Sequence, residues 1–153
     1  MEEICTSYNK HVFETDPKPL KIGNRTLVSR MFVGTGKFSS SSVMAAAVEA
    51  SASEVVTVAL RRIDLSHNVA DQDPVSMLDR QKIILLPNTS GARDAEEAVR
   101  LAQLARQMGG GDWVKLEVTP DPVYLLPDPI ETLKAAEILV HEGFSVLPYI
   151  NAD

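Results

Sequence analysis

A lysine and a glutamate stand two residues apart in the short stretch "WVKLEV", at positions 113 to 118. Successive side chains of a β-strand point to opposite faces, so in a strand Lys115 and Glu117 share one face. Desolvation lowers the pKa of a lysine, and its neutral amine can then attack a ketone or aldehyde to form an imine. A carboxylate two residues along, roughly 7 Å away at Cα, can reach the same substrate and move the protons that imine formation needs.

The same two residues also have a purely structural interpretation, as an ion pair that is satisfied at the end of a strand. Buried ion pairs are weak stabilisers because the cost of desolvation offsets the Coulomb attraction. A fold therefore gains little from such a pair on an inward strand face, whereas a Schiff-base site needs both groups. From the residues alone, the structural and the catalytic interpretation both stay open.

Polar residues follow other expected strands as well, where the sites of α/β proteins lie. "GTGKF" (34–38) has neither the P-loop spacing nor the dinucleotide-binding spacing, which leaves a tight turn or an anion contact at a helix N-terminus. "PNTSG" (87–91) is either a turn with a helix cap at Ser90 or a set of hydrogen-bond donors at a barrel mouth. Arg61 and Arg62 are either solvated surface charges or contacts for an anionic substrate.

Apolar runs and helical spacing predict the elements that position these groups. A short hairpin turning at Gly23 leads into a first strand within 20–34, and continuous apolar runs predict the later strands 54–60, 82–87, 113–118 and 144–150. Helical spacing predicts helices at 39–51, 90–108 and 125–143. The polar stretch 61–74 is expected to be a long loop, with a short helix after it.

Each expected helix has an apolar face and local signals at its ends. In the third helix Asp128 is the expected N-cap, followed by Pro129 at the first helical position and Glu131 three residues after the cap. Glycines at 109–111 end the second helix. The expected buried faces are Val43, Ala46, Ala47 and Ala50; Ala95, Ala98, Val99, Ala102 and Ala105; and Leu133, Ala136 and Val140.

The order of strands and helices predicts an α/β fold with a parallel sheet. Two architectures fit this order: an open doubly wound sheet, or part of a (β/α)₈ barrel. A whole barrel needs about 250 residues, whereas this chain has 153 and about five of the eight strands. Because the sequence stops directly after a strand, we expect a partial barrel rather than a finished domain.

The bulk composition is that of an ordinary globular protein, with 44% hydrophobic and 24% charged residues. A net charge of −6 argues against a nucleic-acid or anionic-membrane partner. The single cysteine, Cys5, excludes a disulfide within the chain and favours a cytoplasmic protein. We expect a flexible leader at 1–18 and one domain at 19–153, and we predict neither a metal nor an organic cofactor.

Four stretches together resemble the thiazole synthases of thiamine biosynthesis, over about Leu20 to Asp153. They are "FVGTGKFSSSSVMAAAVEASASEVVTVALRRIDL", "ILLPNTSGARDAEEAVRLAQLAR", "WVKLEV" and "LLPDPIETLKAAEILVHEGFSVLPY". The resemblance implies a cytoplasmic TIM-barrel transferase that builds thiazole phosphate from 1-deoxy-D-xylulose 5-phosphate, dehydroglycine and sulfur. It also implies a homo-oligomer and a ubiquitin-like sulfur-carrier protein that brings the sulfur as a C-terminal thiocarboxylate.

The resemblance implies a role for both residues of the opening pair. Lys115 matches the lysine that forms the Schiff base with the sugar ketone, and Glu117 matches the candidate acid/base. The family's "DAGIG" stretch, with its catalytic aspartate, and its glycine-rich phosphate loops do not occur in this sequence, so the phosphate-binding residues are unknown.

Three expectations therefore stand side by side. The first is a thiazole synthase, present here as a fragment or a truncated form. The second is a non-catalytic half barrel that pairs with itself or with a missing half. The third is an aldolase-like Schiff-base barrel for another sugar phosphate, against which the "PNTSG" and "LLPDPIETLKAAE" stretches argue.

Overall fold

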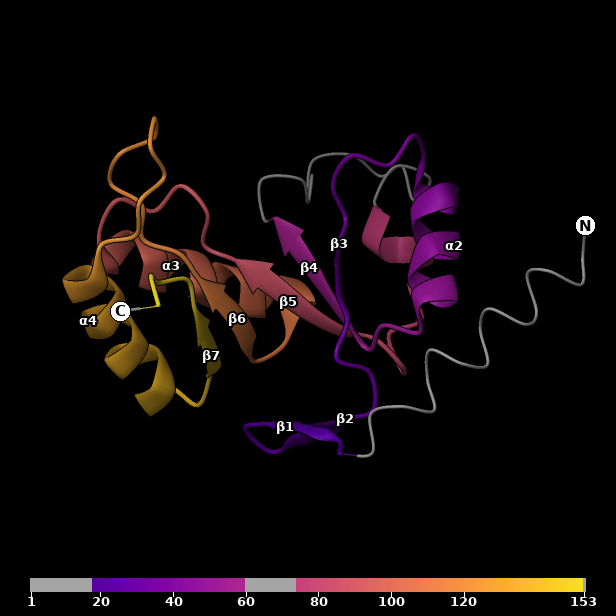
Figure 1. Cartoon of the computed structure of the whole chain (residues 1–153). Helices are drawn as coiled ribbons and strands as arrows, with labels where there is room; N and C mark the ends of the chain where they lie inside the picture. Colours follow the sequence, from indigo (N-terminus) through magenta and orange to yellow (C-terminus); the bar gives the residue numbers. More distant parts are fainter. Residues whose placement is uncertain (1–17, 60–73, 153) are drawn as a thin grey trace, which may run out of the picture. The chain divides into compact units, whose positions relative to one another are not determined.

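The computed structural model describes residues 18–59 and 74–152 (Figure 1). Contacts along the chain divide it into two compact units, Met1–Arg30 and Met31–Asp153. Nearly all of the expected leader, and both Arg61 and Arg62, lie outside the described residues. The domain limits expected from the sequence stay a prediction.

The first unit contains the expected hairpin. Strands β1 (Leu20–Ile22) and β2 (Arg25–Leu27) pair antiparallel. Gly23, in the turn between them, has a φ of 57°, which glycine adopts without steric cost. The prediction of a glycine-based hairpin before the first strand of the larger sheet is thus confirmed.

The second unit is built on a sheet of five parallel strands within the described residues. These are β3 (Phe32–Gly34), β4 (Val55–Ala59), β5 (Ile84–Asn88), β6 (Trp113–Leu116) and β7 (Ser145–Pro148). Their order in the sheet follows their order in the chain. A doubly wound sheet reverses its strand order at a switch point, whereas a barrel does not. The strand order therefore selects the partial barrel of the two expected architectures.

Helices connect these strands at the places that the sequence predicts. They are α2 (Ser41–Ser51), the short 3₁₀ helix η2 (Pro74–Met77), α3 (Ala95–Ala105), the π-helical turn η3 (Arg106–Gly110) and α4 (Pro129–His141). Asp128 caps α4 by accepting hydrogen bonds from the N–H groups of Ile130 and Glu131. In the described part of the chain no helix is long and apolar enough to cross a membrane.

Two apolar clusters join the helices to one face of the sheet. Val114, Leu116 and Val118 of the β6 segment pack with α3 and α4, which lie side by side (Figure 1). The second cluster joins α2 and η2 to β4 and β5 through Met44, Val48, Val56, Val58, Val75, Leu78 and Leu85. Because side chains alternate along a strand, Trp113 and Lys115 of β6 lie on the opposite face, and Glu117, the residue after Leu116, continues this alternation.

The buried face of α3 is the one predicted, but the helix begins later than predicted. Ala95, Ala98, Val99, Ala102 and Ala105 are all buried. The helix starts at Ala95 because Asp94 is the N-cap and accepts a hydrogen bond from Glu97 N–H. The expected cap at Ser90 is therefore wrong, since Ser90 N–H instead bonds to Asn88 Oδ1 in the preceding turn.

The predicted buried face of α2 is wrong. Met44 and Val48 are the buried residues of this helix, whereas Val43 is 48% exposed. The stretch is rich in alanine and valine on more than one side. The helical spacing of apolar residues therefore fits two neighbouring faces of this helix. In the structure the face that carries the larger Met44 side chain packs against the sheet.

The predicted buried face of α4 is wrong for two of its three residues, since only Ala136 packs against the core cluster of α3, α4 and β6. Thr132, Ala135 and Leu139 are buried, whereas Leu133 is 68% and Val140 57% exposed. The two apolar faces lie one residue apart along the helix. Contacts with α3 and β6 select between them.

Candidate active site

The Lys115 and Glu117 side chains meet on the face of the sheet that the helices do not cover. Lys115 Nζ lies 3.1 Å from Glu117 Oε1. The lysine side chain is 40% exposed and the glutamate side chain 14% exposed. The prediction that both residues share one strand face is confirmed, and their long side chains close the gap between the two backbone positions.

The segments that follow β7 and β5 each add one residue near the pair, Tyr149 and Thr89, that the sequence did not single out. Tyr149, which follows β7, places its ring centroid 5.8 Å from Lys115 Nζ. Its backbone N–H donates to Leu116 O at 2.8 Å, which continues the parallel pairing of β6 with β7. An aromatic face attracts a cation, so Tyr149 can contact the positive charge of a protonated imine formed at this nitrogen.

The strand β5 approaches the pair from the other side. Asn88, its last residue, pairs in register with Lys115. The next residue, Thr89, is fully buried, and its hydroxyl contacts the backbone of Glu117. The sequence suggested either a turn or hydrogen-bond donors for this segment but did not single out Thr89, because a contact 28 residues away leaves no local pattern.

The "GTGKF" stretch forms a tight connection between β3 and α2. Thr35 Oγ1 donates to Thr57 O at 3.3 Å, and Lys37 has a φ of 69°, which is uncommon for a residue other than glycine. The connection ends at Ser40, the N-cap of α2. The turn interpretation of this stretch therefore accounts for its geometry.

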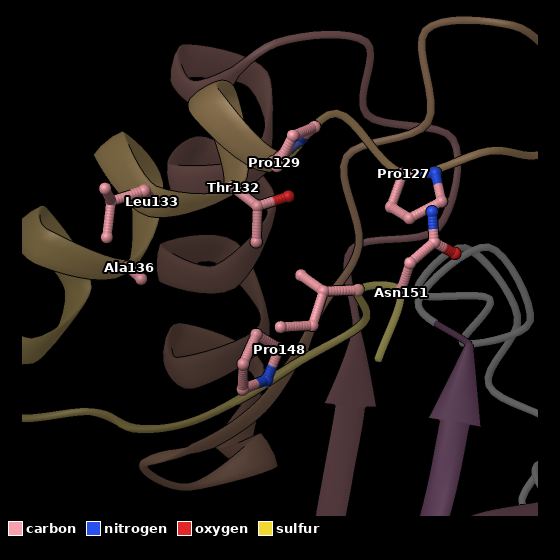
Figure 2. Close-up of a pocket in the computed structure, with 8 residues that line it drawn as sticks. Pro127, Pro129, Thr132, Leu133, Ala136, Pro148 and Asn151 are labelled. Carbon is pink, nitrogen blue, oxygen red and sulfur yellow. The ribbon is translucent and has the colours of Figure 1, made fainter. Parts of the chain in front are cut away.

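A groove lies between α4 and the end of β7 (Figure 2). Its volume is about 510 Å³, and its lining is mostly apolar. Thr132 contributes a buried hydroxyl that has no hydrogen-bond partner. The lining residues are Pro127, Pro129, Thr132, Leu133, Ala136, Pro148, Ile150 and Asn151.

A metal-binding site would need several ligand side chains close together. Across residues 18–59 and 74–152, no three histidine, cysteine, aspartate or glutamate side chains are grouped in a way that could hold a metal ion.

Comparison with known proteins places the chain in a family. Residues 21–153 match the family described as "Thiazole biosynthesis protein ThiG". The chain belongs to this family. Thiazole synthase 2 of Syntrophotalea carbinolica is 68% identical over 134 residues, which are 88% of this chain and 51% of that protein. Thiazole synthase of Syntrophobacter fumaroxidans is 67% identical over 137 residues, which are 89% of this chain and 52% of that protein.

A solved structure resembles the chain over a similar length. It is the complex of BexX with CysO from Amycolatopsis orientalis, with a TM-score of 0.68 and 31% sequence identity. The match covers 87% of this chain and 54% of the other. The chain thus spans about half the length of the thiazole synthases it matches. Its strands correspond to a partial barrel of this family.

Proposed function

We propose that this chain forms part of a thiazole synthase that builds thiazole phosphate for thiamine biosynthesis. The substrates would be 1-deoxy-D-xylulose 5-phosphate, dehydroglycine and sulfur. The observation that carries the proposal is the contact of 3.1 Å between Lys115 Nζ and Glu117 Oε1 on the face of the sheet opposite α3 and α4. Membership of the ThiG family supports it.

In the proposed reaction Lys115 attacks the sugar and Glu117 moves the protons. Glu117 takes a proton from the lysine nitrogen, and the free amine adds to the ketone carbon to give a carbinolamine. Glu117 returns the proton to the departing hydroxyl, water leaves, and a C=N bond replaces the C=O bond. The same carboxylate can then move a proton during tautomerisation of the imine.

The proposed sulfur donor is a carrier protein with a C-terminal thiocarboxylate. Support comes from the structural neighbour BexX, which was solved in complex with CysO. The partly exposed Lys115 leaves the site open to a peptide tail approaching from solvent. The proposed acceptor of the sulfur, the lysine-bound sugar, therefore lies on the face of β6 opposite α3 and α4.

Borohydride trapping tests the proposal. The chain is incubated with 1-deoxy-D-xylulose 5-phosphate and sodium borohydride, and its peptides are weighed by mass spectrometry. We expect a reduced adduct on the peptide that contains Lys115, and its complete loss in Lys115→Ala, because alanine has no amine. An adduct of equal yield in Lys115→Ala, or none in the unchanged chain, would overturn the proposal.

A second candidate function is a non-catalytic half barrel that pairs with another protein segment. The apolar residues Leu133 and Val140 of α4 are exposed, and β7 is an edge strand of the described sheet. Edge strands with apolar neighbours attract a further strand. This candidate predicts pairing without any borohydride-trapped adduct on Lys115, which separates it from the first.

A further inference from the structure

One hydroxyl group holds both backbone polar groups of Glu117. Thr89 Oγ1 accepts a hydrogen bond from Glu117 N–H at 2.8 Å and donates one to Glu117 O, also at 2.8 Å. The Thr89 side chain is fully buried. A β-branched side chain has a restricted χ1 angle, so this hydroxyl has little freedom to move.

This contact replaces the backbone pairing that would otherwise fix Glu117. Strands β5 and β6 pair at Asn88 and Lys115, and Thr89 N–H donates to Lys115 O at 3.2 Å. The strand β6 ends at Leu116, one residue before Glu117. At Glu117 the Thr89 hydroxyl makes the two backbone hydrogen bonds that a neighbouring strand would otherwise make. It thereby extends the ordered backbone of β6 by one residue.

We propose that Thr89 is a positioning residue that holds the Glu117 carboxylate against Lys115. This proposal rests on the proposed imine chemistry. It adds Thr89 as the residue that fixes the position of the Glu117 carboxylate, the proposed acid/base. The hydroxyl of Thr89 bonds to the backbone of Glu117, so Thr89 acts through that backbone. A displacement of about 1 Å at a catalytic group can lower a rate by about a hundredfold.

Three variants separate positioning from simple loss of stability. Thr89→Val keeps the shape of the side chain and removes the hydroxyl, whereas Thr89→Ser keeps the hydroxyl. Ser53→Ala is the matched control, because Ser53 is buried and its hydroxyl lies 2.6 and 2.8 Å from the carbonyls of Met31 and Val55, next to the amino-terminal end of β4. It removes a comparable buried hydroxyl at the opposite end of the strands.

The first measurement is the rate of borohydride trapping as a function of 1-deoxy-D-xylulose 5-phosphate concentration. We expect Thr89→Val to lower the rate at saturation by about tenfold or more, with the half-saturating concentration unchanged. Thr89→Ser should restore the rate to within about twofold, and Ser53→Ala should keep it. Equal rates in Thr89→Val and the unchanged chain would overturn the proposal, and so would an equal loss in Ser53→Ala.

The second measurement is hydrogen exchange of the Glu117 amide, which needs no substrate. We expect strong protection in the unchanged chain and in Thr89→Ser, and exchange at least about tenfold faster in Thr89→Val, because its acceptor is lost. Unchanged protection in Thr89→Val overturns the positioning role even if trapping fails in every variant. Absence of trapping in the unchanged chain, with the expected exchange pattern, overturns the proposed imine chemistry alone.

Discussion

At the scale of single residues, the energetics of the Lys115–Glu117 pair argue for chemistry rather than stability. The lysine side chain is 40% exposed, and ion pairs that are open to water contribute only about 0–1 kcal/mol. The pair nevertheless has Tyr149 and Thr89 around it, with the Tyr149 ring near the lysine nitrogen and the Thr89 hydroxyl on the Glu117 backbone. The pair therefore adds little to the stability of the fold.

Glu117→Gln tests the acid/base role at this scale. The substitution keeps the shape of the side chain and removes its ability to take a proton. We expect borohydride trapping on Lys115 to slow by about a hundredfold or more, in line with the usual contribution of a positioned acid/base.

Glu49→Gln is the control for this prediction, because Glu49 is exposed on α2. Its trapping rate should equal that of the unchanged chain. A Glu117→Gln variant that traps the sugar as fast as the control would show that the carboxylate takes no part in imine formation.

At the scale of elements, the beginnings of α3 and α4 are tied together by one carboxylate. Glu131, in the first turn of α4, accepts a hydrogen bond from Ala95 N–H at the start of α3 and contacts Lys134 Nζ at 2.6 Å. It therefore satisfies an N–H group that α3 leaves without a helical partner. The Lys134 ammonium, and after it the Ala95 N–H, hold the pKa of Glu131 below its usual value of 4.5.

The lowered pKa of Glu131 sets a pH dependence of stability. A carboxyl whose pKa is lower in the folded chain stabilises the fold at a pH above its unfolded value of 4.5. That stabilisation disappears as the pH falls through the folded value. We expect Glu131→Gln to lower the melting temperature at pH 7, and the difference from the unchanged chain to shrink steadily below pH 4.5.

Melting curves recorded between neutral pH and pH 3 check this expectation. Glu137→Gln serves as the control, because Glu137 is an exposed residue of the same helix. A gap between Glu131→Gln and the unchanged chain that stays constant through the acid range would rule out the proposed cause.

At the scale of the whole molecule, two exposed features belong to neighbouring elements, α4 and β7. The strand β7 is at the edge of the described sheet, and α4, which precedes it, exposes Leu133 at 68%. Parallel strands are joined by right-handed crossovers, so a further strand beside β7 brings a helix beside α4. The matched thiazole synthases are about twice as long as the aligned segment. We therefore expect this face to receive a further strand and helix.

Leu133→Glu tests the docking face. The chain is mixed with a separately produced second half of the Syntrophotalea carbinolica thiazole synthase 2, and complex formation is followed by sedimentation velocity. We expect a one-to-one complex with the unchanged chain, and association weakened by about tenfold or more in Leu133→Glu, because a charge would enter an apolar contact. The melting temperature of the variant alone should hardly change, since Leu133 is exposed.

Val43→Glu provides the comparison, because Val43 is similarly exposed on α2, away from β7. It should bind the second half like the unchanged chain. Association of the chain with itself that Leu133→Glu abolishes would assign the face to a second copy. Failure of the unchanged chain to associate with either partner would contradict the proposed pairing.

The sequence alone determined the kind and order of the elements and the central pair. The cap at Asp128, the apolar face of α3 and the shared strand face of Lys115 and Glu117 were all predicted correctly. Each depends on neighbours within a few residues: a side chain that caps its own helix, a helical period, or the alternation of a strand. Such signals act through local geometry, so they are present before the chain folds.

Only the tertiary structure decided which face of α4 is buried and what surrounds the pair. Leu133 and Leu139 are equally apolar, and contact with α3 and β6 selects Leu139 for the core. Thr89 and Tyr149 approach β6 through the register of parallel strands that are far apart in the sequence. Register comes from packing between distant segments, which leaves no periodic pattern in either segment by itself.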